Sequence, residues 1–314
     1  MCRSRNLVEM KCVYGCLPAR SIHRICCLLG GRYASAAQLP ATPGFEGMGV
    51  VDAVGPGWLA KIRRLKPGRR VAVLNRKSGN WQEYVVIPAR QAVPVPDDLS
   101  DEQAAAFFVN PASALAMIRH VLRVQKNSWL AQTAAGSALG RMVIRLGRHF
   151  GFKTINVIRR PEQAQELLDL GGNEVICTAK ESVTDRLQAI TGGTGVPYAL
   201  DAVGGETGSQ VAAGLAVGGR MLVYGTLSDQ PLSVHPRLLI SGQRIIEGFW
   251  LSIWAQNQRV ITMLSLFRQI MRLLQLGVLT SEIAATYPLD RIKDAVEHAA
   301  RPGKNGKVLL RIGD

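Results

Sequence analysis

The feature that most constrains the fold is a regular alternation of short apolar runs and amphipathic stretches between about residues 113 and 247. The run Lys153–Ile158 is rich in β-branched residues, which is typical of a strand. The stretch 139–150 repeats its apolar side chains at helical spacing. Further strands are expected at Ser128–Gln132, Glu174–Cys177, Tyr198–Val203 and Arg220–Tyr224, and further helices at Pro161–Leu170, Val183–Thr191 and Ser209–Leu215. This series predicts an α/β fold with a doubly wound parallel sheet.

The flanking regions have a different texture. Residues 35–110 are rich in Gly, Pro and Val, with strand-like runs at Val71–Leu74 and Tyr84–Ile87. Beyond Gly248 we expect a long amphipathic helix over Gln256–Gln275 and a final strand at Lys307–Ile312. The flanks therefore predict a second, β-rich domain into which the α/β domain is inserted.

The chain of 314 residues carries a formal net charge of +15, and its charge bears on the partners that we expect. The basic residues are scattered and are not interleaved with aromatic side chains, so a solvated surface and an anionic cofactor explain them better than a nucleic-acid partner does. No apolar run reaches the roughly 20 residues that a membrane span needs, and no signal peptide is recognisable. We expect a cytoplasmic protein without a membrane partner.

The turn after the first α/β strand is the candidate cofactor site. It reads Ala135, Gly136, Ser137, Ala138, Leu139, Gly140. Only the last glycine of the G-x-G-x-x-G pattern is kept, but small residues still let backbone N–H groups approach a pyrophosphate at a helix N-terminus. Gly140 would let the helix pack closely on the strand. The same small residues also occur in ordinary turns, so the motif depends on its place between strand and helix.

The second strand of the α/β region bears on the choice of cofactor. An NAD site places Asp or Glu about 20 residues beyond the glycines, to hold the ribose 2′-hydroxyl. The segment 156–160 has no acid there and carries Arg159 and Arg160. Two arginines at this point can pair with a 2′-phosphate, which favours NADPH, although they could also be surface residues at a strand end.

From about Tyr33 onward the chain resembles the zinc-independent medium-chain dehydrogenases/reductases, above all their 2-enoyl-thioester reductases and quinone reductases. The segments that carry the resemblance are 39–49 (LPATPGFEGMG), 79–84 (GNWQEY), 110–114 (NPASA), the turn 135–140, and 248–251 (GFWL) with Trp254. The resemblance implies a GroES-like catalytic domain over 1–112 and 248–314, a Rossmann NADPH-binding domain over 113–247, and a homodimer.

The resemblance also implies roles for individual residues. In the enoyl-thioester reductases a tyrosine of a G-x-Y segment acts as proton donor or polariser, and Tyr33 matches it. Trp81, Asn110 and Ser113 would line the substrate pocket. Further cofactor contacts would come from Tyr224, Gly225, Phe249, Trp250 and Lys307. Tyr33 could instead be a surface tyrosine, and the tryptophans could belong to the core.

A zinc centre is not expected. Zinc-dependent relatives use a histidine in a G-H-E-G motif, and this chain has Phe45 at that position. An aryl ring cannot ligate a metal, and no cysteine occurs between Cys27 and Cys177 to build a structural zinc lobe. The expected chemistry is hydride transfer from NADPH to a 2-enoyl thioester. The alternatives are a quinone acceptor, a catalytically impaired NADPH-binding protein and, from another class, a basic nucleic-acid binder.

The beginning of the chain is anomalous. Five of the six cysteines precede residue 28. The E-V-x-V-R and N-P-S-D-L segments that the resemblance implies for this part of the chain are missing. When degenerate codons for Ser21–Leu28 are read one base earlier, they permit Asn, Pro, Ser, Asp and Leu in order. We hypothesise that residues 1 to about 30 are translated out of frame, which would remove the N-terminal strands of the catalytic domain. The coding DNA tests this.

Overall fold

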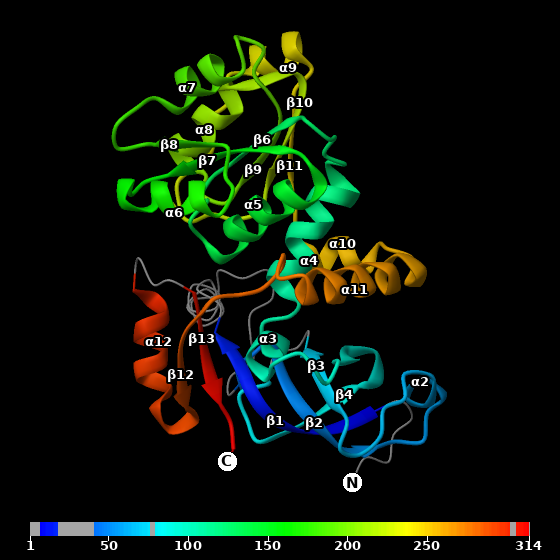
Figure 1. The fold of residues 1–314 in the computed structure, drawn as a ribbon. Helices are drawn as coiled ribbons and strands as arrows, with labels where there is room; N and C mark the ends of the chain where they lie inside the picture. The colour runs from blue at the N-terminus through cyan, green and yellow to red at the C-terminus, as the bar shows by residue number, and fades with distance from the viewer. Residues whose placement is uncertain (1–6, 18–40, 76–78, 302–305, 314) are drawn as a thin grey trace. The chain divides into compact units, whose positions relative to one another are not determined.

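The computed structural model describes residues 7–17, 41–75, 79–301 and 306–313. The chain divides into two compact units, each with its own sheet. Unit 1 comprises Met1–Val109 and Thr280–Asp314, and unit 2 is the continuous stretch Asn110–Leu279. Figure 1 shows their elements.

Unit 2 is built on a six-stranded sheet in the order β11-β10-β9-β6-β7-β8, in which every neighbouring pair is parallel. Strands β7 and β8 lie on one side of β6, and β9, β10 and β11 lie on the other, so the switch point of the sheet lies between β6 and β9. The strands are β6 (Trp129–Gln132), β7 (Lys153–Ile158), β8 (Glu174–Cys177), β9 (Val196–Asp201), β10 (Leu215–Val223) and β11 (Ile245–Gly248). The predicted α/β fold with a doubly wound parallel sheet is confirmed.

Helices cover both faces of this sheet. Figure 1 shows α5 and α6 on one side and α7, α8 and α9 on the other. The helices of unit 2 are α4 (Val109–Leu115), the π-helix η2 (Ala116–Val121), α5 (Ala138–Phe150), η3 (Pro161–Gln163), α6 (Ala164–Asp169), α7 (Val183–Ile190), α8 (Gly205–Ala213), α9 (Pro236–Gly242), α10 (Leu251–Gln256) and α11 (Val260–Gln275). The long helix expected at 256–275 is α11, which ends at Gln275 as expected but begins at Val260, after α10 has ended at Gln256.

Unit 1 contains a seven-stranded sheet in the order β12-β13-β1-β2-β3-β5, with β4 paired to β1. The strands are β1 (Leu7–Leu17), β2 (Glu46–Val54), β3 (Arg70–Leu74), β4 (Tyr84–Pro88), β5 (Ala92–Pro94), β12 (Ile283–Pro288) and β13 (Lys307–Arg311). Its helices are α2 (Trp58–Ile62), η1 (Ala89–Gln91), α3 (Asp101–Ala105), η4 (Leu289–Arg291) and α12 (Ile292–Ala300).

Strand β1 corrects the expectation that the N-terminal strands are missing. It pairs antiparallel with β2, β4 and β13, so it joins three other strands of unit 1. Val8 and Met10 are buried, whereas Leu7 and Glu9 are half-buried, which is the alternation of a strand with one face on a core. The cysteine and arginine content of residues 1–34 masked this short period-2 pattern.

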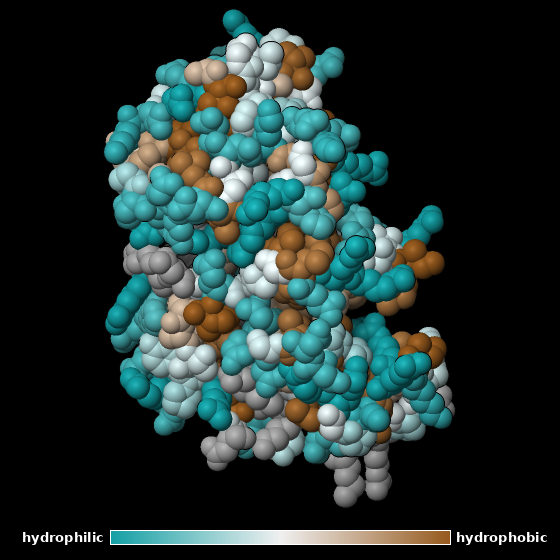
Figure 2. Space-filling model, viewed as in Figure 1, coloured by the Kyte–Doolittle hydropathy of each residue, from teal (hydrophilic) through white to brown (hydrophobic). Residues whose placement is uncertain are grey.

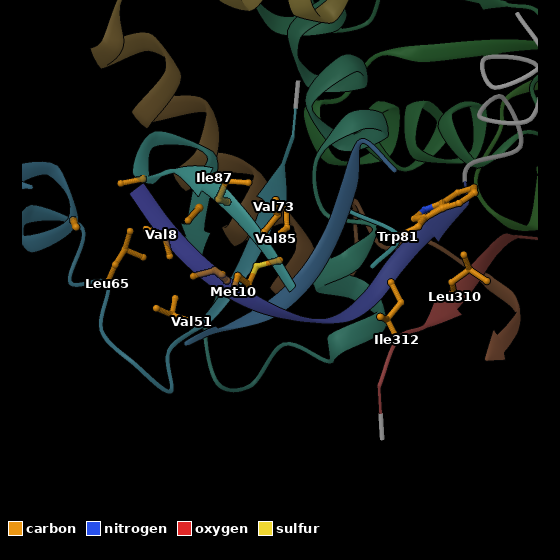
Figure 3. Packing of buried hydrophobic residues seen from close by; sticks show 14 of the residues in the cluster. Val8, Met10, Val51, Leu65, Val73, Trp81, Val85, Ile87, Leu310 and Ile312 are labelled. Atoms are coloured by element: carbon orange, nitrogen blue, oxygen red, sulfur yellow. The ribbon is translucent and has the colours of Figure 1, made fainter. Parts of the chain in front are cut away.

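The core of unit 1 joins the two ends of the described chain. Figure 3 shows Val8 and Met10 of β1 among the packed apolar side chains, with Val51, Val73 and Val85 from neighbouring strands. Leu310 and Ile312, from β13 and the residues after it, belong to the same cluster. Burial of this apolar surface is the main force that holds the sheet together.

The second compact unit also ends later than we expected. The segment 248–279 was assigned to the β domain, but it belongs to unit 2. Strand β11 pairs with β10, and Phe249 donates its N–H to the Val223 carbonyl at 2.8 Å. Four apolar side chains of α11 are buried: Leu266, Ile270, Leu273 and Leu274.

Candidate functional site

The turn between β6 and α5 folds tightly on itself. Ser137 caps α5 by accepting the Gly140 N–H at 3.1 Å. A Cβ atom on Gly140 would lie 2.4 Å from the Ala135 carbonyl oxygen, closer than atoms can approach. Only glycine therefore allows the first turn of α5 to rest against the backbone of the loop.

The electrostatics of this turn suit an anionic group. No acidic residue lies in the first turn of α5, and the N-terminus of a helix carries a partial positive charge. The turn also follows β6, the strand from which the sheet order reverses, where doubly wound proteins bind their ligands. The turn residues therefore fit the pyrophosphate of a dinucleotide.

A buried polar network holds the neighbouring loop beside this turn. Thr133 and Asp201 are completely buried, and the Thr133 hydroxyl donates to Asp201 Oδ1 at 2.6 Å. The Asp201 carboxylate also accepts the N–H groups of Val203 at 3.0 Å and Gly204 at 2.9 Å. The network thereby fixes the ends of β6 and β9 relative to each other. Sequence reasoning missed it, because its partners come from different strands.

The end of the second strand presents the two predicted arginines. Arg159 is exposed, and Arg160 is half-buried with its Nε atom 3.8 Å from Glu162 Oε1. Asn156, by contrast, is buried and accepts a hydrogen bond from Gln132 at 2.8 Å. Of the segment 156–160, it is therefore Arg159 and Arg160 that can reach a ligand.

Two further contacts around the turn were not predicted. A Cβ atom on Gly136 would lie 2.6 Å from the side-chain nitrogen of Gln163, so this amide covers the turn directly. Arg141 is buried and forms a two-pronged ion pair with Glu166 at 2.6 and 2.7 Å, and its Nε donates to the Gly136 carbonyl at 3.3 Å. The hydrogen bonds from Arg141 lower the pKa of the Glu166 carboxyl. The sequence did not predict this pair, because the position of Arg141 on its own helix does not indicate a partner on α6.

The residue that follows β10, Tyr224, lies beside the network of Thr133 and Asp201. Tyr224 donates its N–H to the Asp201 carbonyl at 2.8 Å, and Gly225 is the next residue. Phe249 is buried, and its ring lies 6.3 Å from that of Trp254. Trp250 is half-buried and accepts the Trp254 N–H. The backbone thus brings Tyr224 beside Asp201, while Phe249 and Trp250 begin the segment after β11.

Asn110 and Ser113 both lie on α4, where Asn110 is half-buried and Ser113 buried. The chain then continues as the π-helix η2, in which His120 packs against Trp254 with ring centroids 5.5 Å apart. Burial, reinforced by Arg119 and Arg123, lowers the pKa of His120. The surroundings of His120 therefore favour the neutral imidazole over the charged one.

Two predicted site residues of unit 1, Lys307 and Trp81, are buried in its interior. Lys307 was expected to contact the cofactor, but its ammonium is buried and pairs with Glu46 at 2.9 Å. The buried carboxylate holds this lysine in the interior of unit 1, and its contact with the cofactor stays a prediction. Trp81 is buried in the core of unit 1, against Gly44. Tyr33 lies outside the described residues.

Phe45 stands where the zinc-dependent relatives have a histidine ligand. Its side chain is half-buried and offers no ligand atom, and its neighbour Glu46 is occupied by Lys307. Within the described parts of the chain, no group of three or more His, Cys, Asp or Glu side chains could hold a metal ion. These residues do not fit a zinc centre.

Comparisons with known families match both units. The family described as alcohol dehydrogenase GroES-like domain matches residues 19–97, and the family described as zinc-binding dehydrogenase matches residues 138–268. The mitochondrial enoyl-[acyl-carrier-protein] reductase of Mus musculus is 32% identical over 290 residues, which cover 91% of this chain and 76% of the relative. The enzyme of the same name from Homo sapiens is 31% identical over the same shares.

Solved structures give a consistent result. A protein described as an NADPH:quinone reductase from Bacillus thuringiensis superposes with a TM-score of 0.89 at 31% identity, over 98% of this chain and 91% of that one. The quinone oxidoreductase of Escherichia coli, solved with NADPH, has a TM-score of 0.86 at 23% identity, over 98% and 93% of the two chains. The second likeness is one of fold.

Proposed function

The chain belongs to the medium-chain dehydrogenase/reductase family, together with enoyl reductases and quinone reductases, and from this premise we propose that it is an NADPH-dependent reductase of 2-enoyl thioesters. The observation that carries the proposal is the turn between β6 and α5. At Gly140 the first turn of α5 packs against the backbone of the loop, and this first turn contains no acidic residue. Arg159 and Arg160 follow the end of β7. All three features suit one phosphorylated dinucleotide.

The residues of unit 2 divide the cofactor between them. The backbone of 135–140 would hold the pyrophosphate, and Arg159 and Arg160 would bind the 2′-phosphate through charge-assisted hydrogen bonds. Tyr224 and Gly225, beside Asp201, and the segment at Phe249 and Trp250 complete the proposed set. When bound, NADPH supplies the hydride.

The remaining chemistry needs a proton and a polarised carbonyl. Tyr33 is the proposed donor, because a phenol can hydrogen-bond to a thioester carbonyl as negative charge develops on its oxygen. Asn110, Ser113 and Trp81 are the proposed substrate contacts. No step is assigned to zinc, since Phe45 occupies the position of the family's histidine ligand.

The first experiment measures binding of NADPH and NADH by the quenching of tryptophan fluorescence. We expect the wild type to bind NADPH at least tenfold more tightly than NADH, because each charge-assisted pair adds about 1.5–3 kcal/mol. Replacing both Arg159 and Arg160 by alanine should remove this preference and leave NADH binding unchanged. Equal loss for both nucleotides would contradict the assigned roles.

The second experiment separates the acceptors. Turnover is measured with crotonyl-CoA, longer enoyl-CoA esters and a quinone. Tyr33→Phe should abolish most enoyl reduction and barely affect quinone reduction, because a quinone accepts hydride without that hydrogen bond. Wild-type activity with the quinone alone would favour the quinone-reductase alternative. NADPH binding without turnover of either acceptor would favour an impaired protein, although β1 removes the structural reason that suggested impairment.

The assembly is also a proposal. Strand β11 pairs with β10, and its Ile245 is 46% exposed, so β11 offers an edge for a second copy to extend the sheet. We infer a homodimer, and light scattering after gel filtration measures its mass.

No helix in the described parts of the chain is long and apolar enough to cross a membrane. A cytoplasmic location stays a prediction, because several relatives are named as mitochondrial; cell fractionation tests it.

A further inference from the structure

Helix α2 of unit 1 presents two large apolar side chains to solvent. Trp58 is 67% exposed and Ile62 is 68% exposed. They are four residues apart, so they lie on the same face of the helix. Ala60 is buried against the core of unit 1, which anchors α2 by its other side. The exposed pair is therefore held outward by the fold.

The surrounding segment is exceptionally basic. Residues 53–82 contain no Asp or Glu and carry eight Lys or Arg residues: Lys61, Arg63, Arg64, Lys66, Arg69, Arg70, Arg76 and Lys77. Of the six that the structure describes, Arg63 and Arg70 bind other parts of unit 1. Arg63 donates to the carbonyl groups of Ala89, Arg90 and Ala92, and Arg70 forms an ion pair with Asp101. These two arginines fasten the segment to its neighbours in unit 1.

The cations beside the apolar pair are Lys61, Arg64 and Lys66, all exposed. Arg90 joins them, because its carbonyl accepts a hydrogen bond from Arg63 at 3.1 Å and its side chain is exposed. None of these four makes an ion pair with any residue that the structure describes. We call Trp58, Lys61, Ile62, Arg64, Lys66 and Arg90 the α2 patch. Figure 2 shows an apolar spot over α2, at the lower right, bordered by hydrophilic atoms.

We propose that the α2 patch docks the protein on the surface of a membrane that contains anionic phospholipids. Tryptophan has an apolar body and a polar N–H, which suits the level of the lipid headgroups, and Ile62 can enter the acyl boundary next to it. Each Lys or Arg near an anionic surface raises binding by about fivefold. Docking of this kind needs no spanning helix, so it is compatible with the absence of one from the described chain.

Charge and chemistry favour lipid over nucleic acid. Both partners are anionic and would attract the four cations. A single strand of RNA, however, is bound by stacking bases on aromatic rings, and Ile62 can neither stack nor form a hydrogen bond. Exposing Ile62 next to Trp58 is useful only if the partner has an apolar layer beneath its charges. A membrane has that layer.

The experiment is co-sedimentation of the full chain with vesicles of phosphatidylcholine alone or of equal parts phosphatidylcholine and phosphatidylserine. We expect binding to the anionic vesicles, weakened by salt. Trp58→Ser with Ile62→Ser should lower it at least tenfold, and Lys61→Gln with Lys66→Gln about 25-fold, the product of two fivefold steps. None of these residues belongs to the proposed cofactor site, so binding of NADPH should be unchanged in both variants.

The matched control is Val260→Ser with Ile261→Ser on α11, where the two side chains are 75% and 77% exposed and follow Arg259. This variant removes the same kind of apolar surface from unit 2, and we expect it to bind vesicles like the wild type. Loss in the control equal to that in the α2 variant would overturn the proposal. So would a wild type that ignores phosphatidylserine vesicles, including one that instead binds single-stranded RNA through Lys61 and Lys66.

Discussion

Two buried carboxylates, Asp201 in unit 2 and Glu46 in unit 1, are neutralised in different ways. Asp201 accepts hydrogen bonds from the Thr133 hydroxyl and from the N–H groups of Val203 and Gly204, which stand two and three residues after it in the chain. Glu46 accepts from the Lys307 ammonium at 2.9 Å and from the Val109 N–H at 3.0 Å. The Asp201 carboxylate is thus stabilised by hydrogen-bond dipoles, two of which come from nearby backbone. The Glu46 carboxylate is stabilised by the full positive charge of Lys307, which is distant in the sequence.

The difference concerns what remains when a partner is removed. Loss of one donor leaves the Asp201 carboxylate with two others, whereas loss of Lys307 leaves the Glu46 carboxylate with the Val109 N–H and no counter-charge. The penalty for an unpaired buried charge is larger than that for an unpaired polar group. Four predictions test this ranking, from the largest effect to the smallest.

Lys307→Met should destabilise unit 1 by about 3–5 kcal/mol, the usual cost of breaking a buried ion pair from one side. Hydrogen–deuterium exchange in β2 and β13 during urea unfolding measures this. The double variant Glu46→Gln with Lys307→Met should recover most of the loss, because no charge is left unpaired. A loss below 1 kcal/mol in the single variant would mean that Glu46 is not buried as the structure has it.

Asp201→Asn should cost unit 2 about 2–3 kcal/mol, as hydrogen bonds to a charged acceptor are lost. The amide keeps one acceptor oxygen but turns an NH₂ group toward donors that cannot pair with it. Exchange rates in β6 and β9 report the effect. NADPH binding should weaken as well, since the turn at 133–137 is held to β9 through this carboxylate. An effect larger than that of Lys307→Met would reverse the ranking.

Thr133→Val should cost about 1–2 kcal/mol, because the shape is kept while one donor to Asp201 and the acceptor of the Ala202 N–H disappear. Thermal unfolding of this variant, of Asp201→Asn and of their double variant gives the coupling between the two residues. Strict additivity would show that the hydroxyl and the carboxylate do not act together.

The smallest effect concerns Glu166, whose carboxyl is half exposed and pairs with Arg141. The folded-state pKa of Glu166 is lowered from its ordinary value of 4.5, so the pair stabilises the folded state above that pH and the stabilisation is lost as pH falls through the folded pKa. Urea unfolding is measured between about pH 3 and 6, on both sides of that value. As the pH falls, the free energy of unfolding should decrease more steeply in the wild type than in Glu166→Gln. Parallel curves would leave the pair without a role in acid stability.

The fold was largely predictable, because the α/β unit is local in sequence. The strand Lys153–Ile158 coincides with β7, and the helix expected at 139–150 is α5, which begins at Ala138. Such elements follow from periodicity within one short window. Strand β1 was missed because its alternation is short and lies among cysteines and basic residues. The reading frame of the first 30 residues stays a hypothesis for the coding DNA.

The site was predictable only where its signal is local. The turn with Gly140 and the arginines at the end of β7 follow from spacing, and the structure supports the close packing expected at Gly140. Their cofactor roles stay predictions. Gln163, Arg141 with Glu166, and Thr133 with Asp201 depend on contacts between different elements, which one sequence does not reveal. The pairing of Lys307 with Glu46 on β2 was not predicted for the same reason.

The position of β1 also sets an order of synthesis. Unit 2 is one continuous stretch, so it can fold as soon as residues 110–279 have left the ribosome. Among the strands that the structure describes, β1 comes first in the sequence and its partner β13 comes last. During translation the end of β1 that pairs with β13, Tyr14–Leu17, therefore keeps an open edge after β2 and β4 have been made, and open edges make a nascent chain prone to aggregate. Premature termination before residue 307 would leave a finished nucleotide-binding half attached to a permanently open sheet.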